Sequence, residues 1–383
     1  MRAAFCSAPP TIARTGSRSV SSDKPGYLDA IVLTVDCYRA ARSPSWMLGE
    51  CIMSGKRGAA DMAGVSIVES VDANDYAGRM NGWNMRMDQV SSGRFTGRLV
   101  MIRLRGLEIV RETTTQALLK QGSAWPDALV FSLPLEISNP GYYNGRPLEF
   151  PQLLLSDGAN LLPLLTSTRV DVVSVAVARD RLFSCLDALG ETRAADFIAG
   201  LRGQQHFFSG PVLAGLQYGL RRLCDQGERL GPALAFEHVR RSLQDTVVGA
   251  LADVLSENDW TDVRGSTAQK QTVDRIREYV FERVEDPPRI AELCRHVGVS
   301  RRTLQGCFQD ALGLTPLQYL RMLRLNAVRR ELRALAATGQ PVSIGDVAAR
   351  WGFWHWSRFT ENYRQLFGEL PSHTVQRVAS ASR

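Results

Sequence analysis

A segment near the C-terminus is followed by an approximate copy of itself, and this repeat constrains the fold more than any other feature of the sequence. The first copy has apolar, glycine and proline positions at Ile290, Leu293, Val297, Gly298, Leu304, Phe308, Gly313 and Pro316. The second has the matching positions, after one inserted residue, at Ile344, Val347, Trp351, Gly352, Phe359, Tyr363, Gly368 and Pro371. In each copy a glycine separates two segments of helical apolar spacing, which predicts two helices joined by a tight turn.

The second helix of the first copy begins with polar side chains. Ser300 is a good N-cap, and Leu304 and Phe308 share a helix face that we expect to be buried. The residues left at the outward, N-terminal end are Arg301, Arg302, Thr303 and Gln305. Such an end can reach base edges in a major groove of DNA, while its free backbone N–H groups suit a phosphate.

The second copy predicts a similar helix, with Phe359, Tyr363 and Phe367 buried. Its outward residues are His355, Ser357, Arg358, Glu361 and Asn362. Three tryptophans, Trp351, Trp354 and Trp356, surround the turn of this unit. We expect them mainly to pack the unit, although Trp356 on its rim could instead contact DNA.

A single long helix is predicted between the two units. Thr315 followed by Pro316 is the preferred order of N-cap and first helical residue, and the helix can run to Leu335. About 20 residues at a rise of 1.5 Å span about 30 Å, close to the roughly 34 Å that separates successive major-groove faces. One chain could therefore place both units on one DNA site. The alternative is a helical bundle whose arginines merely face solvent.

The positive charge of the chain lies in this same region. Residues 266–383 hold 18 Lys and Arg against 11 Asp and Glu, an excess of 18 − 11 = 7 that equals the net charge of the whole chain. A basic C-terminal part beside a neutral N-terminal part is what the neutralisation of DNA phosphates requires. Arginines of this kind bind guanine or phosphate, and either use suits Arg302 and Arg358.

Short apolar or alternating runs upstream of the repeat predict β-strands. They cover residues 95–104, 107–115, 128–135, 148–155 and 170–178, and consecutive strands of this length suggest a sandwich or barrel. Helices are expected over residues 211–226 and 232–257. The second carries a stripe of Leu243, Val247, Ala250, Leu251 and Val254, which fits either a core face or a dimer seam.

The predicted organisation has four parts. Residues 1–64 form an extension that we expect to be disordered, with Met62 as an alternative start; residues 65–258 form a strand-rich domain with C-terminal helices; residues 259–266 form a linker; and residues 267–383 form the DNA-binding domain. A small-molecule pocket in the strand-rich domain could be lined by Trp125, Phe131, Tyr142, Tyr143 and Asn144.

The composition argues against an enzyme. All five histidines lie at or after His206, beyond the predicted strands, so no histidine-ligated metal can sit in the strand region. The seven cysteines are scattered, with no CxxC pair, which argues against a zinc site or a disulfide framework. No apolar run reaches the roughly 18 residues of a membrane span, and the expected location is the cytoplasm.

The run VSRRTLQGCFQDALGLTPLQYLRMLRLNAVRREL, followed by VSIGDVAARWGFWHWSRFTENYRQLFGELPS, resembles the DNA-binding module of the AraC/XylS family across its full length. The resemblance implies an α+β protein: a cupin-like β-barrel sensor domain with helices, followed by an all-α domain of two helix-turn-helix units. It further implies that Arg302 and Gln305 read bases, with Ser357, Arg358 and Glu361 in the corresponding places. Gly306 departs from the family pattern, because a long polar side chain is common there.

The phrases WGFWH and RLNAVRREL resemble the regulators of ethanolamine-utilisation operons within that family. The implied effector is a small amine such as ethanolamine, with cobalamin as a possible companion and no other cofactor. The implied partners are double-stranded promoter DNA, RNA polymerase and a second copy of the chain, with activation as the outcome. The alternative is a constitutive or architectural DNA-binding protein whose barrel only dimerises.

Overall fold

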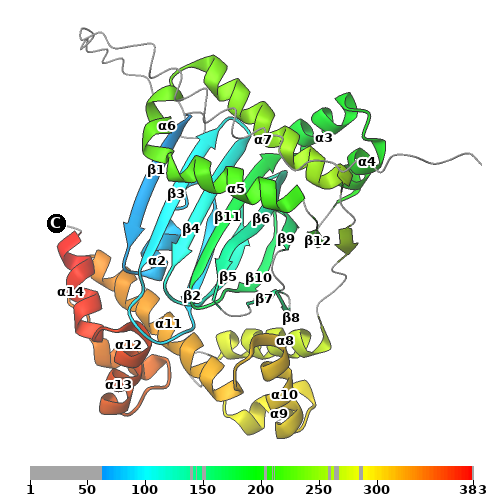
Figure 1. Ribbon diagram of the computed structural model, residues 1–383. Coiled ribbons are helices and arrows are strands. Elements are labelled where there is room, and N and C mark those ends of the chain that lie inside the picture. The colour runs from blue at the N-terminus through cyan, green and yellow to red at the C-terminus, as the bar shows by residue number, and fades with distance from the viewer. Residues whose placement is uncertain are drawn as a thin grey trace, which may run out of the picture.

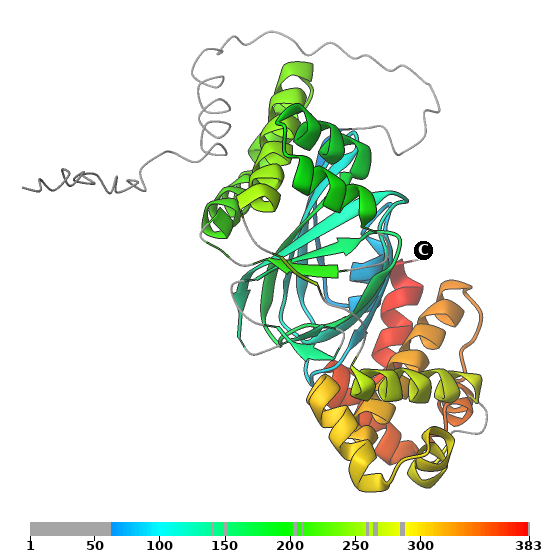
Figure 2. The ribbon, with the colours of Figure 1, turned by 90° about the vertical axis from the view of Figure 1, so that its right-hand side faces the viewer.

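The computed structural model describes residues 63–381, apart from 139–140, 144, 149–151, 202–204, 209, 211, 258–259, 263–266 and 284–287. Residues 1–62 of the expected extension, and residues 259 and 263–266 of the expected linker, lie outside the described part. The described chain forms a β-sheet half, with helices packed on one side, and a helical C-terminal half gathered at one end (Figures 1 and 2). No described helix is both long and apolar enough to cross a membrane.

The N-terminal half contains two antiparallel sheets. The larger has the strand order β1 (Gly64–Ser70), β3 (Gly97–Leu104), β4 (Leu107–Thr114), β11 (Val170–Ala178), β6 (Ala128–Ile137), β9 (Leu153–Asp157), β12 (Gln205–Phe208) and β13 (Trp260–Asp262). The smaller has the order β2 (Asn84–Gln89), β5 (Leu118–Ser123), β10 (Leu161–Leu165), β7 (Tyr142–Tyr143) and β8 (Arg146–Pro147).

The larger sheet is buried on both faces, which explains its nearly continuous apolar strands. Along β3, Val100 and Ile102 pack beneath the helices, whereas Leu99 and Met101 pack toward the smaller sheet. This is the two-residue alternation of a strand with a core on each side. The covering helices are α3 (Arg179–Ala188), α4 (Thr192–Gly200), α5 (Val212–Asp225), α6 (Gly227–Ala233) and α7 (Glu237–Glu257). A short helix, α2 (Ala73–Gly78), joins β1 to β2.

The expected closed, cupin-like barrel is not found in the described part of the chain. Strands β1 and β13 end one sheet and β2 and β8 end the other, and no hydrogen-bonded ladder joins these edges among the described residues. The outer apolar face of the larger sheet is covered by helices, so closure is not needed to bury it. The fold is therefore α+β, with two open sheets in place of a barrel.

The apolar stripe of α7 belongs to the interior of a single chain. Leu243, Val247, Leu251 and Val254 are fully buried in the core that α7 shares with the larger sheet. Ala250 is partly buried against the same core. These side chains are thus unavailable as a dimer seam.

The C-terminal half follows the predicted repeat. Its helices are α8 (Ala268–Glu282), α9 (Ile290–Val297), α10 (Arg301–Leu312), α11 (Pro316–Ala337), α12 (Ile344–Arg350), α13 (Trp356–Phe367) and α14 (Pro371–Ala381). The matching turn residues Gly298 and Gly352 have φ values of 72° and 79°, a left-handed conformation that glycine adopts at little cost. Helices α9 and α10 form the first helix-turn-helix unit, and α12 and α13 form the second.

The two halves pack against each other through polar as well as apolar contacts. The amide of Asn326 on α11 accepts a hydrogen bond from the backbone N–H of Gln89 at 3.0 Å and donates one to the carbonyl oxygen of Gln89 at 2.8 Å. The backbone N–H of Gly93 donates to the carbonyl of Leu366 in the second unit. Tyr142 packs into the core of the C-terminal half and approaches Gly313, at the end of α10. The N-terminal half therefore touches both units.

Candidate nucleic-acid interface

Helix α10 presents the side chains that the sequence assigns to DNA. The hydroxyl of Ser300 accepts a hydrogen bond from the backbone N–H of Thr303 at 3.1 Å and so caps the helix. Leu304 and Phe308 are fully buried. The exposed residues at this end include all four that were predicted, Arg301, Arg302, Thr303 and Gln305.

Helix α13 repeats this arrangement in the second unit. Phe359 and Tyr363 are fully buried, and their side chains fix the helix against the unit's core. His355, Trp356, Ser357, Arg358 and Glu361 are exposed, whereas Asn362 is half-buried. The polar start of α13 is therefore open to a ligand, as is that of α10.

The three tryptophans of the second unit behave differently from one another. Trp351 is half-buried and donates its indole N–H to Glu331 at 2.7 Å, which is the packing role that the sequence predicts for it. Trp354 and Trp356 are 73% and 54% exposed, so the expectation of packing is wrong for Trp354. Trp356 lies on the rim and contacts Phe359, with 5.7 Å between ring centroids.

Helix α11 joins the units and is locked at its start. Thr315 and Gln318 form a reciprocal capping box, and Pro316 occupies the first turn. The helix has 22 residues, so at 1.5 Å per residue its length is about 33 Å. This length matches the roughly 34 Å of one DNA turn.

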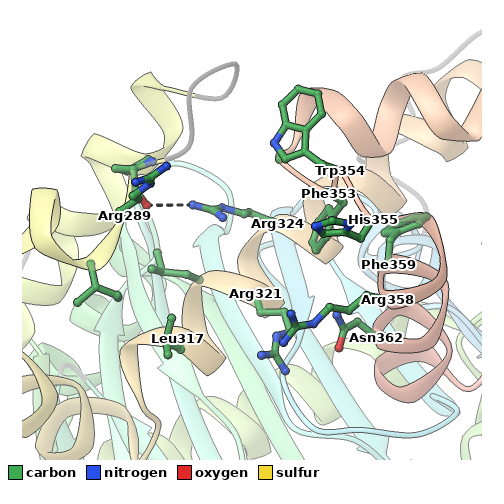
Figure 3. A pocket seen from close by; sticks show the side chains of 14 residues that line it. Arg289, Leu317, Arg321, Arg324, Phe353, Trp354, His355, Arg358, Phe359 and Asn362 are labelled. Atoms are coloured by element: carbon green, nitrogen blue, oxygen red, sulfur yellow. Dashed lines mark hydrogen bonds between the residues drawn. The ribbon is translucent and has the colours of Figure 1, made fainter.

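A cleft of about 430 Å³ lies between the two units, and sequence reasoning did not find it. Figure 3 shows Arg289 and Arg324 on one side of it and His355, Arg358 and Asn362 on the other, with Arg321 between them. Apolar residues contributed by α9, α11, α13 and the turn before α13 complete its wall: Ile290, Leu317, Leu320, Phe353, Trp354 and Phe359. Arg321 and Arg324 are three residues apart and share a face of α11. This spacing is the sequence signal from which a basic surface on α11 could have been predicted.

A buried charge cluster fixes the C-terminal half to the sheet half. The carboxylate of Asp72, at the start of α2, accepts hydrogen bonds from Arg329 at 2.7 Å and from Arg377 at 3.1 Å, and Arg333 lies 2.9 Å away. Burial alone would raise the pKa of Asp72, but the charges of these three arginines outweigh it and hold that pKa well below its usual range. Glu369 shares Arg329 and Arg377 with Asp72.

The predicted effector-pocket residues do not come together. Tyr143 lines a small cavity of about 50 Å³ between the two sheets. Trp125 packs edge-on against Trp83, which lines that cavity. Phe131 faces the helices on the other side of the larger sheet, and Tyr142 packs against the core of the C-terminal half. Asn144 lies outside the described residues.

The cavity between the sheets has polar walls that the sequence did not reveal. Lys120 donates a hydrogen bond to Glu112 at 2.5 Å, and both side chains are buried. The second carboxylate oxygen of Glu112 is buried and has no hydrogen-bond partner among the described residues. Gln121, Ser132, Ser156 and Ser174 also line the cavity.

Comparison with known proteins places the chain in a family. A helix-turn-helix domain family model matches residues 293–377. XylDLEGF operon transcriptional activator 2 of Pseudomonas putida is 34% identical over 142 residues, which cover 37% of this chain and 85% of that protein. The chain belongs to the AraC/XylS family.

Other relatives and solved structures match over different shares of their length. The probable thc operon regulatory protein of Rhodococcus erythropolis is 38% identical over 101 residues, which cover 26% of this chain and 30% of that relative. A solved AraC-type transcriptional regulator from Chromobacterium violaceum is 27% identical and covers 29% of this chain and 94% of that one, with a TM-score of 0.26. Matches to the first curated relatives therefore span a third of those relatives' length or less.

Proposed function

We propose that this protein is a sequence-specific transcription regulator that reads two successive major-groove segments of promoter DNA. Helix α10 enters one segment and α13 the next, with α11 setting their separation. The observation that carries the proposal is the pair of matched helix-turn-helix units, each with a polar, exposed recognition-helix start. The excess of basic side chains in residues 266–383 supports it, because phosphate neutralisation supplies much of the affinity for DNA.

Within each unit we assign base reading to the longer exposed side chains. Arg302 and Arg358 each pair with a guanine, and Gln305 pairs with an adenine, each pair being worth about 1–3 kcal/mol against a wrong base. The shorter or flanking residues complete the footprint: Arg301, Thr303, His355, Trp356, Ser357 and Glu361. Glu361 suits the amino group of a cytosine.

Genomic footprinting of the full-length protein, followed by gel shifts on the recovered sites, tests this function. We expect discrete promoter sites with two half-motifs about one helical turn apart. Equal affinity for recovered sites and random duplexes would reduce the protein to a non-specific DNA binder and refute the proposal.

We further propose that residues 65–258 act as a sensor of a small effector and residues 267–383 as the DNA-binding domain. The unpartnered oxygen of Glu112 favours a ligand with a hydrogen-bond donor, and a small amine such as ethanolamine satisfies it. Cobalamin is far too large for a cavity of about 50 Å³. Calorimetric titration with ethanolamine should give heat with the wild type and none with Glu112→Gln. No heat with the wild type would favour a constitutive DNA-binding protein.

We propose a mode of regulation on the basis of the names of the relatives. Curated relatives are described as operon transcriptional activators, which supports activation through RNA polymerase. A homodimer would need a surface other than the buried stripe of α7. Transcription from a recovered promoter with purified polymerase tests the first point, and sedimentation of the full chain tests the second.

A further inference from the structure

The cleft between the two units contains an excess of unpaired positive charge. Arg289, Arg321, Arg324 and Arg358 line it, and no carboxylate does so among the described residues. Arginines on the faces of this half that pack against acidic side chains are paired instead: Arg330 pairs with Asp88, and Arg350 pairs with Glu331. None of the four cleft arginines makes an ion pair with a described residue. A concave surface with this charge is a site for an anion.

Arg324 carries the clearest sign of a missing acceptor. Its side chain is partly buried, and burial lowers the pKa of its guanidinium, although arginine keeps its proton in proteins. One terminal nitrogen donates to the carbonyl of Pro288 at 3.3 Å, as Figure 3 shows. Its Nε is buried and has no hydrogen-bond partner among the described residues. A buried donor without an acceptor is destabilising, and more so when it is charged, so an incoming anion would satisfy it.

Two helix N-termini at the cleft add to its positive potential. Helices α9 and α13 begin at its wall, at Ile290 and just after His355, and no side chain caps either of them. By contrast, side-chain hydroxyls cap α8, α10, α11 and α12. Uncapped N-terminal N–H groups carry a partial positive charge and bind phosphate. The uncapped starts therefore coincide with the unpaired arginines.

We propose that this cleft seats a phosphodiester group of the DNA backbone, on the strand that passes between the major-groove segments read by α10 and α13. The inference rests on the proposed DNA-binding function and extends it to Arg289, Arg321 and Arg324. Phosphate contacts fix the position of a protein on DNA without reading sequence. The cleft thus sets the register of both recognition helices on the duplex.

The test is a salt series on the full-length protein carrying Arg321→Gln or Arg324→Gln, with a recovered site and a random duplex of equal length. The slope of log affinity against log salt should fall by up to about 0.9 for each phosphate that is no longer neutralised. Affinity for both duplexes should fall by the same factor, leaving their ratio unchanged. Arg324→Lys, which keeps the charge, should restore most of the slope.

Arg229→Gln is the matched control. Arg229 is exposed on α6, at the far end of the molecule from α9 and α10, and its loss changes net charge equally (Figure 1). Arg321 is also exposed and makes no ion pair with a described residue, so its variant should keep the wild-type melting temperature.

Three results would overturn the phosphate site. A salt slope equal to that of the wild type in both glutamine variants would show that the cleft binds no phosphate. A changed ratio of the affinities for the two duplexes would show that the cleft arginines read bases. Loss of transcription activation with unchanged DNA affinity would assign the cleft to an acidic protein partner. Failure of the proposed function looks different, because the wild type itself would then show no preference for its recovered sites.

Discussion

Replacing Asp72 with asparagine should separate the contribution of the buried charge cluster from that of the surrounding packing. The variant keeps the oxygen that caps α2 by accepting hydrogen bonds from Asn74 and Asp75. It removes the negative charge that faces Arg329, Arg333 and Arg377. An asparagine N–H₂ group would face donors only, so no new hydrogen bond replaces those of the carboxylate.

The magnitude follows from burial. The side chain of Asp72 is 0% exposed and that of Arg329 is 4% exposed, and removing one partner of such a pair costs about 3–5 kcal/mol. Glu369 still faces Arg329 at 2.7 Å and Arg377 at 2.8 Å, so we expect the lower end, about 3 kcal/mol. Asp75→Asn is the control, because Asp75 is 36% exposed at the edge of the cluster, where it pairs with Arg79 at 3.6 Å and lies 4.0 Å from Arg333, and such exposed contacts are worth about 0–1 kcal/mol each.

Urea denaturation of the full chain, monitored by tryptophan fluorescence, measures both variants. The pH dependence gives a second readout. The pKa of Asp72 is depressed in the folded state, so its stabilisation is present above the unfolded value, about pH 3.9, and is lost as pH falls toward the folded pKa. The difference between wild type and Asp72→Asn should therefore shrink below about pH 4. A destabilisation under about 1 kcal/mol at neutral pH, or a difference that does not change with pH, would refute the reasoning.

Further predictions concern the reading helices and their turns. Arg302→Ala and Arg358→Ala should each weaken binding to a recovered site by about 1–3 kcal/mol and relax the sequence preference at one base pair. Selection of binding sites from random duplexes measures that preference. Equal weakening of binding to every sequence would show that the two arginines contact phosphates instead. Gly298→Ala should destabilise the first unit by about 1 kcal/mol, because φ is 72° there, although a Cβ would meet no atom within 4 Å. Gly306 lies inside α10, and a Cβ there would also meet no atom within 4 Å, so Gly306→Ala should instead stabilise the folded protein by up to about 1 kcal/mol. Thermal denaturation measures this change, and a lower melting temperature would mean that the glycine has a packing role.

The features that could be predicted from the sequence are those fixed by neighbouring residues. Helix α10 begins directly after Ser300 and α11 directly after Thr315, because a cap and an apolar period are local signals. The exposed residues of α10 and α13 follow from the same periods. Five strands of the larger sheet also follow from local apolar runs, among them β3 at Gly97–Leu104 and β4 at Leu107–Thr114, whereas no predicted run covers the other strands, such as β1, β2, β5 and β10.

The features that could not be predicted depend on contacts between distant residues. Asp72 and Arg329 are 257 positions apart, and the cleft combines α9, α11 and α13. Whether the sheets close depends on the pairing of their edges, which apolar periodicity does not specify. The sequence predicts Phe131 as a pocket residue, but a strand buried on both faces gives no sign of which face holds the cavity. Phe131 faces the helices, and its neighbour Val130 faces the cavity.

The hydrogen bonds between Gln89 and Asn326 bear on how this protein avoids aggregation. Strand β2 is the outermost strand of the smaller sheet, and the N–H and C=O of Gln89 point away from β5 to the amide of Asn326. That amide occupies the place where a further strand would otherwise pair. A bare strand edge is a template for pairing with another chain. Any change that separates α11 from β2 therefore exposes the unpaired backbone N–H and C=O of Gln89 at the sheet edge. Intact contact between the halves thus also protects the protein from aggregation.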